Sequence, residues 1–177
     1  FVYGPKDDPL VRRDWRLPYG GDELARFGEI LARCRARGIE LLWCISPGRS
    51  IAYSSEADVN ALAAKIASVR ALGVRSFGLL LDDIPMELQH PEDRAVHGEL
   101  ALAHVALVAR LLARMEPSDS LVVCPTVYWG EGDEPYLARL GSGLDPRVSL
   151  FWTGRAICAP RIDLREAERF AATAGRP

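Results

Sequence analysis

The stretch Ser-Phe-Gly-Leu-Leu-Leu-Asp-Asp, residues 76–83, indicates the fold class of this chain. Ser76 to Leu81 are all apolar or small, and the run has the length of a β-strand. Two carboxylates follow where the run ends, and a loop with Pro85 and Pro91 leads into a segment of helical period over about residues 92–115. The segment therefore predicts a strand, a polar loop and a helix, in that order.

The same unit of strand, loop and helix occurs five times along the chain. In the first unit, Leu24, Phe27 and Leu31 share one face of a predicted helix that stops at Gly38. The second predicted helix is expected to begin with an N-cap at Ser54 or Ser55. Predicted strands begin near residues 1, 40, 76, 120 and 148, and predicted helices cover about residues 22–37, 55–72, 92–115, 134–140 and 163–174.

Strands that alternate with helices favour an α/β fold with a parallel sheet, because a parallel connection needs a dozen or more residues. No Gly-x-Gly-x-x-Gly segment follows any strand, so the sequence lacks the motif that would best indicate a doubly wound nucleotide-binding sheet. We predict part of a (β/α)8 barrel instead. No linker is apparent, so residues 1–177 are expected to be a single piece of one catalytic domain from a longer protein.

Composition excludes several classes of protein. The 177 residues are 49% hydrophobic and 26% charged, with a net charge of -2, which is ordinary for a folded domain and unlike a disordered chain. Without a basic stripe, neither nucleic acid nor anionic lipid is an expected partner, and no apolar run predicts membrane insertion. The four cysteines have irregular spacing, so neither structural zinc nor a disulfide framework is expected.

Polar residues follow each predicted strand, at the end of a barrel where active sites are built. The pair Asp82-Asp83 is the strongest signal, because paired carboxylates are the usual tools of glycoside cleavage. Adjacent strand residues alternate in direction and cannot easily flank a bond, so a substrate-assisted route fits better. In that route the sugar's own 2-acetamido oxygen attacks the anomeric carbon. The alternative is that either Asp caps the turn or binds a cation.

Other residues at the strand ends have both structural and functional interpretations. Lys6 is either a solvated charge or a donor to a sugar hydroxyl, Tyr128 either packs the loop or donates from a pocket wall, and Cys124 is expected to line a pocket. Asp7 and Asp8 are expected to pair locally with Arg12, Arg13 or Arg16. His97 and His104 lie seven residues apart on the predicted helix 92–115, and we expect them to be structural, with no metal site.

The motifs at the strand ends resemble those of glycoside hydrolase family 84, the β-N-acetylglucosaminidases that include the protein O-GlcNAcases and bacterial enzymes labelled hyaluronidases. Five motifs occur in the family's order and correspond to its second to sixth barrel strands. They are Tyr3-Gly4-Pro5-Lys6-Asp7-Asp8, Ile45-Ser46-Pro47-Gly48, Asp82-Asp83-Ile84, Cys124-Pro125-Thr126 with Tyr128, and Phe151-Trp152-Thr153-Gly154.

The resemblance implies a retaining enzyme that cleaves terminal β-linked N-acetylglucosamine and needs no cofactor. By resemblance, Asp82 orients the 2-acetamido group, Asp83 is the general acid and base, and Lys6 holds a sugar hydroxyl. Tyr128 hydrogen-bonds near the acetamido group, while Cys124 and Ile157 line the pocket around it. The implied partner is a glycan or glycoprotein that carries N-acetylglucosamine.

The family pattern also has elements that this chain lacks. The family's first strand is expected to precede Phe1, its last strands are expected to follow Pro177, and Val127 stands where many relatives have Glu. Two other functions stay open at this point. One is a carbohydrate-binding pseudoenzyme with the same barrel, and the other is a phosphoryl enzyme that uses the two Asp-Asp pairs as magnesium ligands. The sequence indicates no compartment, since any signal peptide would lie upstream of Phe1.

Overall fold

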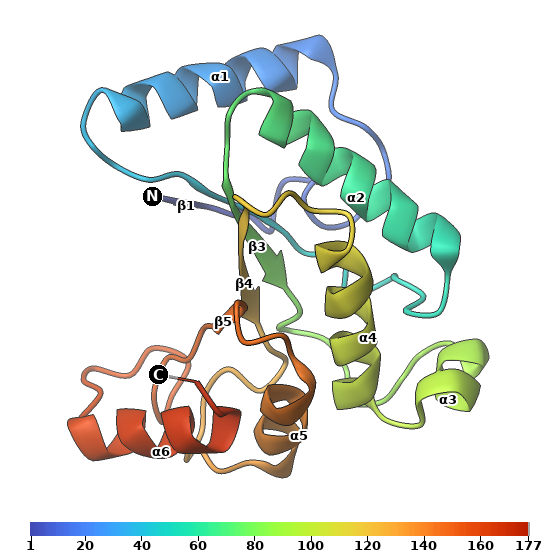
Figure 1. Cartoon of the computed structure of the whole chain (residues 1–177), viewed down its shortest axis with the longest axis vertical. Helices are drawn as coiled ribbons and strands as arrows, with labels where there is room; N and C mark the ends of the chain where they lie inside the picture. The colour runs from blue at the N-terminus through green and yellow to red at the C-terminus, as the bar shows by residue number, and fades with distance from the viewer. Residues whose placement is uncertain (177) are drawn as a thin grey trace.

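A computed structural model describes residues 1–176, and it contains a parallel sheet of five strands in the order β1-β2-β3-β4-β5. The strands are sequence neighbours throughout, and a helical segment follows each of them (Figure 1). The strands are β1 (Val2–Tyr3), β2 (Leu42–Ile45), β3 (Ser76–Leu80), β4 (Ser120–Cys124) and β5 (Ser149–Leu150). The helices are α1 (Gly21–Arg35), α2 (Glu56–Ala71), α3 (Pro91–His97), α4 (Leu100–Leu112), α5 (Pro135–Gly143) and α6 (Leu164–Ala174).

The two faces of the sheet differ, as the alternation of side chains along a strand requires. Trp43, Phe77 and Val123 are buried in the main apolar cluster together with residues of the helices. Cys44 and Cys124 point to the other face, where they form a small cluster with Leu80. The helices lie in an arc around the strands (Figure 1). A parallel sheet with helices on one face and a narrow apolar interior is the geometry of an incomplete barrel.

The predicted helix 92–115 is wrong, because the segment forms two helices. α3 ends at His97 and α4 begins at Leu100, with an angle of 88° between them. Gly98 adopts φ 73 at the break, a left-handed conformation that glycine allows at little steric cost. His97 and His104 therefore lie on different helices and do not share a face.

No single helix within residues 1–176 is long and apolar enough to cross a membrane. The bent pair α3 and α4 passes the same test of length and composition only when both helices are taken together. Most of α4 is packed inside the molecule, with Leu107, Val108 and Leu111 fully buried.

Candidate active site

Lys6, Asp82 and Asp83 meet at the carboxyl end of the sheet, where parallel strands deliver their following loops to one edge. Lys6 follows β1, and the two aspartates follow β3. The Lys6 ammonium donates to Oδ2 of Asp82 and, at 2.8 Å, to Oδ2 of Asp83. Two adjacent carboxylates thus share one cation, although neighbouring side chains on a strand would point in opposite directions.

The backbone at Asp83 explains how the adjacent carboxylates converge. Asp83 has φ 56, and it is the one residue other than glycine with positive φ among those described. Asp and Asn visit this left-handed region more readily than other side chains, yet it is uncommon and clusters at functional sites. The loop after β2 packs closely on this turn, because a Cβ on Gly48 would lie 3.0 Å from Cγ2 of Ile84.

The two carboxylates have different surroundings. Asp82 is buried, with 7% of its surface exposed, and within residues 1–176 its Oδ1 has no hydrogen-bond partner. A buried acceptor without a donor is costly, so a ligand with an N–H or O–H group would be favoured at this atom. The Asp83 side chain is 47% exposed. The hydrogen bond from Lys6 lowers the pKa of Asp83 below its usual value and favours the ionised form.

The charge on Lys6 is also stabilised by this arrangement. Burial alone would lower the pKa of the Lys6 ammonium, but its hydrogen bonds to Asp82 and Asp83 outweigh burial, and the pKa is raised. The hydrogen bonds therefore favour the charged ammonium of Lys6 and the ionised carboxylate of Asp83 together.

Apolar side chains form one wall beside Asp82. Cys124 packs with Cys44 and Leu80, and Tyr128 is partly buried against the same cluster. Burial, with a smaller effect of the charge on Asp82, raises the pKa of the Cys124 thiol to about 12. Cys124 is therefore a neutral apolar wall rather than a nucleophile. Burial and the charges of Asp83 and Asp82 also raise the pKa of Tyr128, so its phenol keeps its proton.

The structure does not bring Ile157 to this group. Ile157 lies after β5 with 57% of its surface exposed, and it belongs to neither of the buried apolar clusters. The residue was expected to line the pocket with Cys124. In the described part of the chain it faces solvent instead.

The expected pairing of Asp7 and Asp8 with nearby arginines is wrong. Asp8 accepts from the backbone N–H of Leu10 at 2.8 Å, so it stabilises its own turn, and Asp7 is exposed. The arginines have other partners. Arg13 pairs with Asp14, and Arg16 donates to both carboxylate oxygens of Asp58, at 2.6 and 2.5 Å.

The contacts of two basic residues near this site were not predicted. The Arg12 side chain is 14% exposed, and its Nη2 lies 3.9 Å from Oδ2 of Asp83. Lys65 is buried in α2 and donates to the backbone carbonyls of Leu10 and Trp15, which anchors the loop that begins with Lys6. The signal for Lys65 is its position among the buried residues of α2, where a charge needs a dedicated partner.

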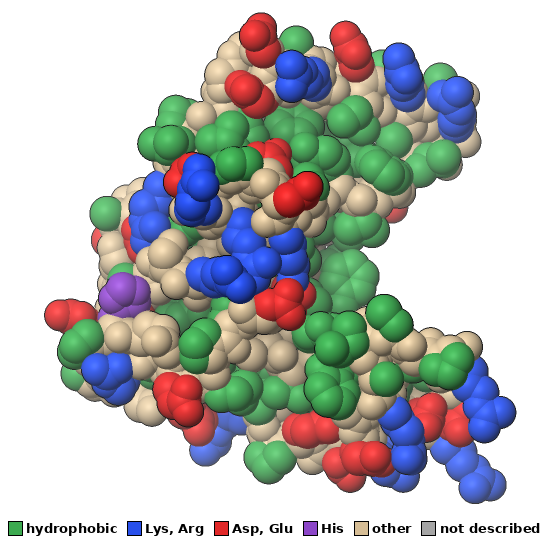
Figure 2. All heavy atoms as spheres, turned by 180° about the vertical axis from the view of Figure 1, so that it is seen from behind, with side chains coloured by type: hydrophobic (Ala, Val, Ile, Leu, Met, Phe, Trp, Pro, Cys, Tyr) green, Lys and Arg blue, Asp and Glu red, His purple; other side chains and the backbone are tan. Residues whose placement is uncertain are grey.

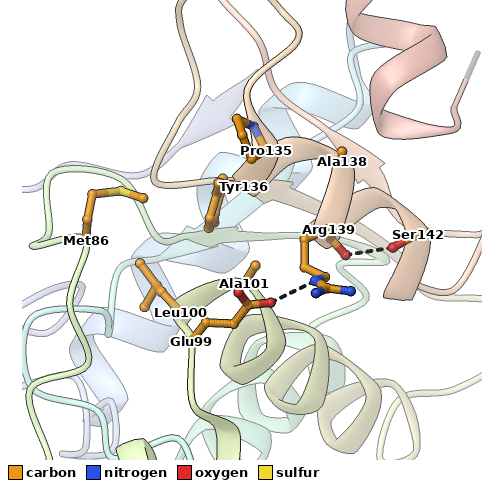
Figure 3. A pocket seen from close by; sticks show the side chains of 9 residues that line it. All are labelled: Met86, Glu99, Leu100, Ala101, Pro135, Tyr136, Ala138, Arg139 and Ser142. Carbon is orange, nitrogen blue, oxygen red and sulfur yellow. Dashed lines mark hydrogen bonds and ion pairs between the residues drawn. The ribbon is translucent and has the colours of Figure 1, made fainter.

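Two cavities differ in their relation to these residues. A cavity of about 340 Å³ beside the acidic pair is lined by four cations, Lys6, Arg12, Arg13 and Arg49, among other residues. Lys and Arg side chains gather near the middle of the face in Figure 2, next to a notch in the outline. A cavity of about 570 Å³ lies between α4 and α5, next to Tyr136, and contains none of the predicted site residues (Figure 3).

The residues present do not form an evident metal centre. Within residues 1–176, no group of three or more His, Cys, Asp and Glu side chains converges on one point. The Lys6 ammonium occupies the place between Asp82 and Asp83 that a magnesium ion would need. The interpretation of the two Asp-Asp pairs as joint magnesium ligands gains no support from this geometry.

Replacing Lys6 with Met is expected to raise the pKa of Asp83. The hydrogen bond from Lys6 is the largest cause of the lowered pKa, so its loss favours the protonated acid. The measurement is an NMR titration of the aspartate carboxyl carbons. Arg13→Met is the matched control, because it removes a neighbouring cation that is paired with Asp14 instead. An unchanged titration midpoint for Asp83 in the Lys6 variant would contradict the electrostatic role of the ammonium.

The chain is similar to curated proteins and to solved structures over nearly its whole length. The chain is 30% identical over 174 residues to the protein O-GlcNAcases of Rattus norvegicus and of Mus musculus, covering 95% of this chain and 19% of each relative. It thus spans about a fifth of the length of these curated relatives. A solved O-GlcNAc hydrolase mutant from Thermobaculum terrenum has 34% identity and a TM-score of 0.97, covering 99% of this chain and 39% of that one.

A second solved structure, described as CpGH84B, has 27% identity and a TM-score of 0.83, over 99% of this chain and 31% of that chain. These similarities confirm the predicted α/β fold with parallel strands as part of the family's barrel. The model of the β-N-acetylglucosaminidase family matches residues 1–177. This chain therefore belongs to the β-N-acetylglucosaminidases of glycoside hydrolase family 84.

Proposed function

We propose that the protein containing this chain hydrolyses terminal β-linked N-acetylglucosamine with retention, and that residues 1–177 supply the catalytic pair as one piece of the catalytic domain. The observation that carries the proposal is the free, buried Oδ1 of Asp82, one residue before an accessible carboxylate. Such an acceptor matches the N–H of a 2-acetamido group, and family membership supports the same substrate class. The natural substrate is then a glycan or glycoprotein that carries this sugar.

The reaction proceeds in two steps through the substrate's own amide. In the first step Asp82 accepts a hydrogen bond from the acetamido N–H, and the amide oxygen forms a bond to the anomeric carbon. The bond from that carbon to the leaving oxygen breaks, and Asp83 gives this oxygen its proton. In the second step the Asp83 carboxylate takes a proton from water, and the water oxygen forms a bond to the anomeric carbon. The bond from that carbon to the amide oxygen breaks, which opens the oxazolinium ring formed in the first step and restores the original configuration.

The role of Asp83 requires a change when substrate binds. In the substrate-free site Lys6 favours the ionised carboxylate, whereas a general acid must hold a proton. A sugar hydroxyl that accepts from Lys6 competes with Asp83 for the ammonium and thereby raises the pKa of the acid. Tyr128 donates near the acetamido group, and Cys124 packs against its methyl group.

The test compares two substrates in the full-length protein that contains residues 1–177. An aryl β-N-acetylglucosaminide should be cleaved, whereas an aryl β-glucoside with the same leaving group should react at least about 10³-fold more slowly, because it lacks the internal nucleophile whose effective concentration drives the first step. NMR of the first product should show the β-anomer. Comparable cleavage of both sugars would contradict substrate assistance, and sugar binding without cleavage would indicate a carbohydrate-binding pseudoenzyme.

A further inference from the structure

His104 is a buried polar residue that the proposed chemistry does not use. It has no exposed surface and lies in α4, between a tyrosine that precedes α2 and another in α5. Its Nδ1 is 2.8 Å from the hydroxyl of Tyr136, and its Nε2 is 3.0 Å from the hydroxyl of Tyr53. A neutral imidazole has one donor and one acceptor, so it bridges the two phenols in either tautomer. Burial lowers the pKa of His104 to about 3. The imidazole is therefore neutral near pH 7, and its two hydrogen bonds do not change with pH in that range.

One end of this bridge continues to the proposed catalytic residues. The Tyr136 hydroxyl accepts from the backbone N–H of Thr126 at 3.2 Å, and the Thr126 hydroxyl donates to the carbonyl oxygen of Leu81 at 2.7 Å. That carbonyl belongs to the peptide group that joins Leu81 to Asp82. Because a peptide group is planar, holding its oxygen also sets the direction in which the chain enters Asp82.

The same bridge also reaches the loop after β4. Thr126 is two residues before Tyr128, whose carbonyl accepts from the N–H of Thr153 at 2.9 Å. Thr126 is thus held on one side by Tyr136 and on the other by Leu81. The uncommon backbone conformation of Asp83, with φ 56, persists only where surrounding contacts hold it, and these bonds supply such contacts directly before the pair.

The other end of the bridge stops at a segment with its own anchors. The backbone N–H of Tyr53 donates to Asp93 at 2.8 Å, and its carbonyl accepts from Arg110 at 2.7 Å. Loss of the Tyr53 hydroxyl therefore leaves its segment in place. Loss of the Tyr136 hydroxyl instead leaves the Thr126 N–H without its partner, in a residue that bonds to the chain directly before Asp82.

We propose that His104 and Tyr136 are positioning residues, which act through Thr126 to hold the peptide group before Asp82 and the loop that carries Tyr128. The inference rests on the proposed catalytic roles of Asp82 and Asp83. It means that helices α4 and α5, where the Tyr136 ring lines the cavity of Figure 3, help through Thr126 to set the geometry of the active site.

The experiment compares Tyr136→Phe with Tyr53→Phe in the full-length protein. Each variant keeps its ring and loses one hydrogen bond to the same imidazole, but only the first disconnects Thr126. Tyr136→Phe should lower kcat about 10- to 100-fold, as expected when catalytic groups move by up to an ångström, whereas KM should change less. Tyr53→Phe should keep kcat within about threefold of the unmodified protein, because the hydroxyl that it removes bonds to His104 and not to Thr126. Equal kcat values for the two variants would overturn the proposal.

Two further measurements separate this proposal from the proposed function. Thr126→Val removes the donor to Leu81 and should lower kcat as Tyr136→Phe does, and the double variant should lose little more, because both residues act in one chain of contacts. The amide signal of Thr126 and the carboxyl-carbon signal of Asp82 should shift in the Tyr136 variant but not in the Tyr53 variant. An unmodified protein without glycosidase activity defeats the proposed function, whereas unshifted NMR signals defeat the positioning role.

Discussion

Replacing Asp83 with Asn is expected to lower kcat/KM by about 10²- to 10⁴-fold for a glycoside with a poor leaving group, the usual contribution of a general acid. Asn has nearly the same shape, and it tolerates the left-handed backbone found at this position. The amide cannot donate a proton to the leaving oxygen. The loss in activity should therefore come from chemistry rather than from misfolding.

The dependence on leaving group identifies the role of Asp83. An aryl leaving group of low pKa departs without protonation, so its cleavage should fall far less in the variant than that of an alkyl glycoside. The measurement is kcat/KM across a series of leaving groups in the full-length protein. Asp7→Asn is the matched control, since Asp7 is an exposed carboxylate near Lys6 and should leave the series unchanged. A uniform loss across the series would assign Asp83 a different role.

The strand positions could be predicted because each apolar run carries its own signal. β3 and β4 lie within a residue or two of the runs that predict them, because a short apolar stretch bounded by polar loops is typical of a buried strand. The break after α3 could not be predicted in the same way. One glycine, Gly98, lies in a segment whose apolar residues keep a helical period across it, and only tertiary packing determines that the chain turns there.

The meeting of Lys6 with Asp82 and Asp83 follows from topology, because parallel strands deliver their carboxyl ends to one edge of the sheet. The detail within the site does not follow from topology. The positive φ of Asp83 has no signature in the residue types around it. The partners of His104 are 32 and 51 residues away along the chain, so their bonds depend on how α4 packs against its neighbours.

Asp82→Asn is expected to lower kcat by about 10²- to 10³-fold, comparable to the loss of one preorganised polar group that stabilises charge in a transition state. As the amide oxygen attacks, positive charge develops on the acetamido nitrogen, and the Asp82 carboxylate stabilises that charge where a neutral amide cannot. Asp83 itself is unchanged in this variant, so the group that protonates the leaving oxygen is still present.

The loss in the Asp82 variant should be the same for good and poor leaving groups, because Asp82 acts on the nucleophile and not on the leaving oxygen. This behaviour is opposite to that expected of the Asp83 variant, and the same substrate series measures both. A loss that is confined to poor leaving groups would mean that Asp82 donates the proton and that the two roles are exchanged. Both carboxylates contact the same ammonium, so that contact does not distinguish their roles. The difference in leaving-group dependence shows which carboxylate acts on the amide and which protonates the leaving oxygen.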